Sequence, residues 1–160
     1  MPVVVVGLSH NTSPVALRER LAFAEPAVPS ALAQLRQRAL AQESVILSTC
    51  NRVEIYAADD RDPECTLRGL QDFLLSFHGS DETLTSELYA WHEPQSLEHL
   101  FRVAAGLDSM VLGETEILGQ LKRAYALALQ HGHTGRRLNR VFQRAFNVAK
   151  QIRTQTQIQR

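Results

Sequence analysis

Two strand-like segments joined by only three residues constrain the fold of this chain more than any other feature of its sequence. Residues 44–48 are apolar between two serines, and residues 52–57 alternate polar and apolar side chains. The linker Thr49-Cys50-Asn51 is too short for the crossover that parallel strands require. We therefore expect a mainly antiparallel sheet, in which Cys50 occupies a tight connection at the end of a strand.

The character of the sequence changes at Pro94. Strand-like and helix-like segments are interspersed before this proline, whereas all segments after it have helical periodicity. The sequence predicts an α+β fold: a small, mainly antiparallel sheet with helices on one face (residues 1–93), followed by a helical part (residues 94–160). No Gly-x-Gly-x-x-Gly motif and no βαβαβ alternation occur, so we expect no dinucleotide-binding fold within these residues. The predicted strands are residues 3–8, 44–48, 52–57 and 88–91, and the predicted helices are residues 15–23, 31–41, 67–78, 96–105, 114–130 and 136 to beyond 152.

Charge is distributed unevenly along the chain, although the formal net charge is zero. Residues 1–116 contain 8 Lys/Arg and 17 Asp/Glu, whereas residues 117–160 contain 9 Lys/Arg and no acid. A basic segment of this kind can attract a phosphate backbone. Alternatively, it is a solvated helix face that meets the acidic part of the same chain.

The two cysteines, Cys50 and Cys65, differ in their charged neighbours. No apolar run approaches the roughly 18 residues of a membrane span, and the apolar N-terminus has no basic stretch, so we expect a cytoplasmic protein with free thiols. A cysteine is nucleophilic as the thiolate, and its ordinary pKa is about 8.5. Acidic residues crowd the chain just before Cys65 and disfavour its thiolate, whereas Arg52 closely follows Cys50. We therefore expect Cys50 to be the nucleophile, against the alternative of a small buried hydrophobic residue.

Arg52 and His99 are the other candidates for chemistry, and each has a plainer alternative. The guanidinium group of Arg52 can hold a carboxylate bidentately, or it can form a surface ion pair with Glu54. His99 lies within a predicted helix, where a histidine is usually a satisfied core residue. With no Cys-x-x-Cys and no His-x-x-x-His pair, we expect no metal site.

Residues 107–114 depart from a simple amphipathic pattern, because Asp108, Ser109 and Glu114 stand among apolar residues. This segment is either a connection between helices that Asp108 or Ser109 caps, or a substrate-binding corner whose glycines permit close approach. Gln120 follows Glu114 in the next helix and can face the same space.

Four segments, taken together and in this order, resemble glutamyl-tRNA reductase, the first enzyme of the C5 route to tetrapyrroles. They are residues 7–19, residues 48–56 (Ser-Thr-Cys-Asn-Arg-Val-Glu-Ile-Tyr), residues 99–120 and residues 138–146. Each segment alone is a weak signal, but the set spans nearly the whole chain and is specific.

The resemblance implies a role for each candidate. Cys50 resembles the nucleophile that attacks the ester of glutamyl-tRNA and forms an enzyme thioester, which NADPH then reduces to glutamate-1-semialdehyde. His99 corresponds to a family histidine near the cysteine and is expected to transfer a proton or to position other groups. The positions expected to bind the glutamate moiety are Thr49, Arg52, Ser109, Glu114 and Gln120.

The resemblance also implies a domain organisation. Full-length members have a catalytic N-terminal domain, an NADPH domain and a helical dimerisation domain, and they form homodimers. We expect residues 1–160 to be the catalytic domain alone, without the NADPH and dimerisation domains and with no cofactor bound. The alternative is a non-catalytic tRNA-binding or regulatory module that retains the fold, as the basic residues between Arg136 and Arg153 suggest.

Overall fold

The computed structural model describes residues 1–109 and 116–156, and a strand or helix is present there for each one predicted. The predicted start of one helix at residue 114 lies outside the described residues. The elements are β1 (Val3–Ser9), α1 (Val15–Leu21), the 3-10 helix η1 (Glu25–Ala27), α2 (Val28–Gln37), β2 (Glu43–Ser48), β3 (Arg52–Ala58), α3 (Pro63–Phe77), the 3-10 helix η2 (Glu82–Glu87), β4 (Tyr89–Trp91), α4 (Gln95–Ala104), α5 (Glu116–Gln130) and α6 (Arg136–Thr156).

The four strands form one antiparallel sheet in the order β2-β3-β1-β4, which confirms the prediction made from the short linker. Ser48 of β2 pairs with Val53 of β3, so the two strands form a hairpin that turns through residues 49–52. β1 lies between β3 and β4, and its Gly7 pairs with Glu54 on one side and with Tyr89 on the other.

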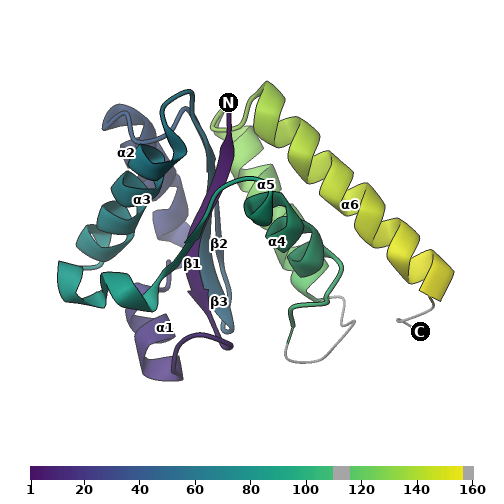
Figure 1. The fold of residues 1–160 in the computed structure, drawn as a ribbon, viewed down its shortest axis with the longest axis horizontal. Helices are drawn as coiled ribbons and strands as arrows, with labels where there is room; N and C mark the ends of the chain where they lie inside the picture. The colour runs from purple at the N-terminus through teal and green to yellow at the C-terminus, as the bar shows by residue number, and fades with distance from the viewer. Residues whose placement is uncertain (110–115, 157–160) are drawn as a thin grey trace.

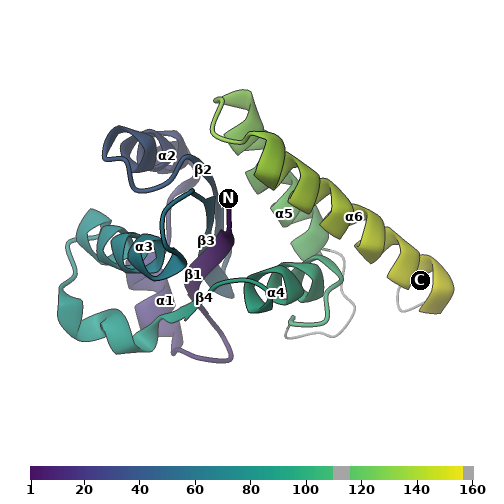
Figure 2. The same cartoon turned by 45° about the horizontal axis from the view of Figure 1, so that its top comes forward.

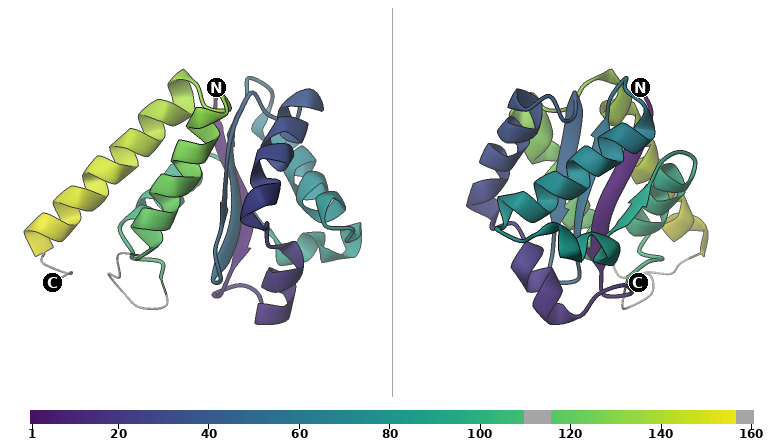
Figure 3. Two further views of the ribbon diagram at one scale, coloured as in Figure 1. Left: turned by 180° about the vertical axis from the view of Figure 1, so that it is seen from behind. Right: turned by 60° about the vertical axis from the view of Figure 1, so that its left-hand side comes forward.

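Helices cover both faces of the sheet. The predicted α+β fold is confirmed, and the helices after Pro94 form the layer on the second face. α1, α2 and α3 lie on one face, and α4, α5 and α6 lie on the other (Figures 1 and 2). Figure 3 shows the sheet edge-on between these two layers. Because both faces are covered, every residue of β1 and β3 is buried.

Successive side chains of β3 point to opposite faces of the sheet and so form two rows. Val53 and Ile55 point to one face and join the apolar core. Arg52, Glu54 and Tyr56 point to the other face, where the ring of Tyr56 meets Phe142 of α6. The polar row of β3 is therefore enclosed beneath the helices that follow Pro94.

Two carboxylates fix α6 to the sheet. Glu43 of β2 accepts hydrogen bonds from the backbone N–H groups of Gly135 (2.9 Å) and Leu138 (2.8 Å), at the start of α6. Glu93 holds Arg137 through both carboxylate oxygens, at 2.9 and 3.0 Å. The contacts of Glu43 supply partners for backbone N–H groups that the start of a helix leaves unpaired.

None of the described helices is long and apolar enough to cross a membrane.

Candidate active site

Cys50 lies at the tip of the β2–β3 hairpin, in a turn that Thr49 holds closed. The N–H of Thr49 donates to the carbonyl of Arg52 (2.8 Å), and its Oγ1 accepts from the N–H groups of Asn51 and Arg52 (3.1 Å each). Cys50 and Cys65 are both exposed free thiols, as expected. Among the described residues, the thiol of Cys50 has no hydrogen-bond or ionic partner, so it is open to a reagent from solvent.

Two neighbouring segments brace this turn. The N–H of His10, just after β1, donates to the carbonyl of Asn51 (2.8 Å). The N–H of Phe23, just after α1, donates to Oγ of Ser48 (2.9 Å). Cys50 therefore stands on a turn that is anchored on both sides, the kind of mount that fixes the position of a reactive group.

Arg52 begins β3 and is almost completely buried, with 1% of its surface exposed. Its Nη1 donates to Glu54 (3.2 Å), and its Nη2 donates to the backbone carbonyl (2.7 Å) and the carboxylate (2.9 Å) of Asp108. Burial is the largest influence on the pKa of Arg52 and lowers it, but the charge of Glu54, the two tyrosines and the hydrogen bond to Asp108 together raise it above its ordinary value. The ion pair with Glu54 that the sequence suggested thus exists, but it is buried and not on the surface.

Glu54 is fully buried at the centre of this network, and our sequence reasoning did not select it as a site residue. Besides Arg52, its carboxylate accepts hydrogen bonds from Tyr56 (2.7 Å), from Tyr89 and from Nε2 of His99. Burial alone would raise the pKa of Glu54, but the interactions with His99 and Arg52 lower it to about 2. Glu54 is therefore a permanent carboxylate at neutral pH. The spacing of residues 52, 54 and 56 on one strand face was the signal that could have identified it.

His99 is buried between Glu54 and aromatic rings. Its ring centroid lies 4.8 Å from that of Trp91 and 5.4 Å from that of Tyr89. Because the carboxylate of Glu54 can only accept a hydrogen bond, Nε2 of His99 carries the proton of this contact. His99 is thus a buried histidine with a hydrogen-bond partner, which is the plainer of the two alternatives that the sequence left open. It is also linked to Arg52 through Glu54.

The remaining predicted residues come from the segment after α4 and from α5. Ser109 follows Asp108, the residue that contacts Arg52. Gln120 of α5 lines a pocket of about 430 Å³ together with Ser48, which precedes Thr49. Glu114 lies outside the described residues. The hairpin therefore holds Thr49, Cys50 and Arg52 together, whereas Ser109 is connected to it only as the chain neighbour of Asp108, and Gln120 only through the pocket that Ser48 also lines.

The arrangement combines an exposed thiol with a buried guanidinium–carboxylate–imidazole network. No contact joins His99 directly to Cys50 within the described part of the chain, so acid–base assistance at the thiol stays a prediction. Within residues 1–109 and 116–156, no cluster of three or more His, Cys, Asp or Glu side chains is arranged to hold a metal ion. The site offers covalent chemistry at sulfur and a cation for an anionic substrate.

Comparison with known proteins gives a consistent result over almost the entire chain. The sequence profile of the glutamyl-tRNA(Glu) reductase N-terminal domain matches residues 6–156. Glutamyl-tRNA reductase of Marinobacter nauticus is 49% identical over 159 residues, which cover 99% of this chain and 36% of that protein. The enzyme of the same name from Stenotrophomonas maltophilia K279a is 49% identical over 158 residues, or 99% of this chain and 35% of that protein.

A solved structure agrees with the sequence comparisons. Glutamyl-tRNA reductase from Methanopyrus kandleri superimposes with a TM-score of 0.80 at 34% identity, covering 96% of this chain and 34% of that one. This chain therefore spans about a third of the length of the relatives it matches.

Proposed function

Because the chain belongs to the glutamyl-tRNA reductase family and matches its N-terminal domain, we propose that it binds glutamyl-tRNA and transfers the glutamyl group to Cys50. The observation that carries this proposal is the geometry of the hairpin tip. There, an exposed, unpaired thiol stands two residues from a buried arginine.

The transfer is an acyl exchange at a carbonyl carbon. The Cys50 thiolate attacks the carbonyl carbon of the ester that joins glutamate to the 3′-terminal ribose of the tRNA. The C–O bond to the ribose breaks, the ribose oxygen takes up a proton, and a glutamyl thioester on Cys50 remains. No oxidant or reductant is consumed in this step.

Arg52 is suited to recognise the glutamyl group. Its Nη2 contacts Asp108, whose side chain is 22% exposed, so the carboxylate on this nitrogen is accessible from solvent. We propose that the free carboxylate of the glutamyl group competes with Asp108 for Nη2, while Nη1 stays on Glu54. In this proposal Thr49, Ser109, Glu114 and Gln120 complete the binding site for the glutamate moiety.

His99 has a supporting role in the proposal. Glu54 holds the proton on Nε2 and fixes the ring plane, which leaves Nδ1 as the nitrogen that can accept or return a proton. We propose that this exchange serves the departing ribose oxygen.

The reduction that completes the family's reaction is not assigned to these residues. A dinucleotide is held at the carboxyl ends of parallel βαβ strands, whereas all the strand pairs described here are antiparallel. The described sheet therefore differs from the parallel sheet of that dinucleotide-binding fold. We propose that NADPH binding and dimerisation belong to the other parts of the family's full-length enzyme.

The test is intact-mass analysis after exposure to glutamyl-tRNA, followed by peptide mapping of the modified residue. The unmodified chain should gain one glutamyl adduct at Cys50, or hydrolyse the ester through it. Both activities should disappear in Cys50→Ser and persist in Cys65→Ser, a matched control because both thiols are free and exposed. Adduct formation that survives in Cys50→Ser, or that depends on Cys65, would overturn the assignment.

The alternative of a non-catalytic tRNA-binding module makes the opposite prediction. Such a module would bind tRNA but would never form an adduct, even with Cys50 in place. Its supporting observation is the basic surface of α6, which is independent of the hairpin.

A further inference from the structure

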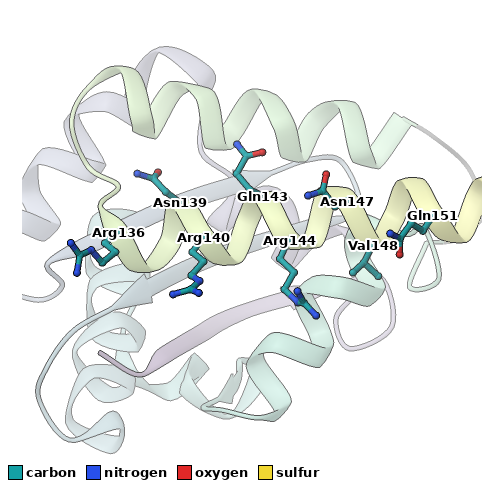
Figure 4. A pocket seen from close by; sticks show the side chains of 8 residues that line it. All are labelled: Arg136, Asn139, Arg140, Gln143, Arg144, Asn147, Val148 and Gln151. Carbon is teal, nitrogen blue, oxygen red and sulfur yellow. The ribbon is translucent and has the colours of Figure 1, made fainter.

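The outward face of α6 carries two parallel rows of polar side chains. Arg136, Arg140 and Arg144 follow one another at intervals of four residues, and Asn139, Gln143 and Asn147 form the adjacent row (Figure 4). An open groove of about 680 Å³ runs among these side chains. Four residues of helix advance about 6 Å, so the guanidinium groups are regularly spaced along the axis.

The charge of the arginine row has no compensation within the described structure. Arg137, one position away, pairs with Glu93, so part of the basic segment does meet an acid of the same chain. By contrast, Arg136, Arg140 and Arg144 are exposed, and none of them has an ion pair with any described residue. Like charges four residues apart on a helix repel one another. The row is therefore stabilised by an external anion more readily than by the protein itself.

The side chains on this face of α6 indicate which kind of anionic partner it can bind. The side chains that line the groove are polar except for Val148 and include three arginines, so the face favours an anionic partner. In the amide row Asn139 already accepts a hydrogen bond from Tyr125 (2.8 Å), but the exposed Gln143 and Asn147 supply donors and acceptors that match the phosphate oxygens and ribose hydroxyls of an RNA strand. A repeating row of cations beside a repeating row of amides fits a polymer with a repeating charged backbone.

We propose that this face of α6 is a docking surface for the phosphate backbone of helical RNA, which Arg136, Arg140 and Arg144 contact. That the RNA is the tRNA of the glutamyl substrate rests on the proposed function. The surface is separate from the hairpin that carries Cys50, so it positions the body of the tRNA while the acylated 3′ end reaches the thiol.

The test is the salt dependence of binding to deacylated tRNA, which removes acyl chemistry from the measurement. The variant is the triple change Arg136→Gln, Arg140→Gln and Arg144→Gln. The matched control is the triple change Arg20→Gln, Arg38→Gln and Arg68→Gln, which removes the same charge from exposed positions in the layer of α1–α3. Thermal unfolding checks that both proteins remain folded.

The α6 variant should bind more weakly, and the slope of log affinity against log salt should fall by about 2 to 3, roughly one per lost phosphate contact. The control should keep most of the slope. Replacement of the same three arginines by lysine should restore it, because lysine also neutralises phosphate.

An equal loss in both triple variants would mean that only net charge matters, and it would overturn the proposal. Equal competition by polyglutamate would overturn the choice of RNA in favour of an acidic protein partner. If the unmodified chain formed no adduct but its binding to deacylated tRNA still depended on Arg136, Arg140 and Arg144, the proposed chemistry would be rejected and this surface would stand.

Discussion

Glu54→Gln replaces a buried carboxylate by a neutral amide of nearly the same shape, at the point where Arg52, His99 and two tyrosines converge. The pKa of Glu54 falls from 4.5 to about 2 in the folded protein. A shift of this size corresponds to about 3 kcal/mol of stabilisation at neutral pH. Removing one partner of a buried ion pair costs about 3–5 kcal/mol, because the other charge is left unpaired. We therefore expect Glu54→Gln to lower the free energy of unfolding by about 3 kcal/mol.

The pH dependence gives the sharper test. Because the folded pKa of Glu54 lies below its unfolded value, its contribution is fully present above about pH 4.5 and is lost as the pH falls towards about 2. The difference between the original chain and Glu54→Gln should therefore be constant from pH 6 to 8 and should shrink below about pH 4.5. Urea unfolding across this range, followed by intrinsic fluorescence, measures the difference.

A matched control lies on α4. Glu98 is exposed, so Glu98→Gln should change the free energy of unfolding by less than about 0.5 kcal/mol at every pH. If Glu54→Gln were as stable as this control, or if its deficit were the same at pH 3 and pH 7, the reasoning about a buried paired carboxylate would be wrong.

Two further predictions concern the elements that hold the site. Glu43→Ala should lower the free energy of unfolding by about 2 kcal/mol, because it removes the acceptor for the N–H groups at the start of α6. Chemical denaturation measures this loss, and the exposed Glu25→Ala should show little of it. Thr49→Val should slow adduct formation at Cys50 and cost about 1–2 kcal/mol, because two N–H groups of the turn lose their acceptor. Thr49→Ser keeps that oxygen, and equal rates in the two variants would contradict the role given to the turn.

Much of the site could be predicted from sequence because it is local. The proposed nucleophile Cys50, the threonine that closes the turn and the arginine all lie within residues 49–52, so a short linker between two strands brings them together without reference to the rest of the fold. The charged neighbours of Cys50 and Cys65 are local in the same way. The specific resemblance then supplied the distant members, His99, Ser109 and Gln120, whose proximity to the hairpin no local pattern indicates.

The sequence by itself determined the antiparallel hairpin, the α+β class and the placement of Cys50 in a tight connection, because these follow from linker length and periodicity. Only the tertiary structure decided that the polar row of β3 is buried. Alternation along a strand shows that its two faces differ, but it does not show what covers each of them. α4 returns across that face, and His99 meets Glu54 from 45 positions along the chain. Enclosed there, away from water, the charges of Glu54 and Arg52 must be satisfied by one another and by side chains from α4 and β4. This requirement made Glu54 the centre of the site.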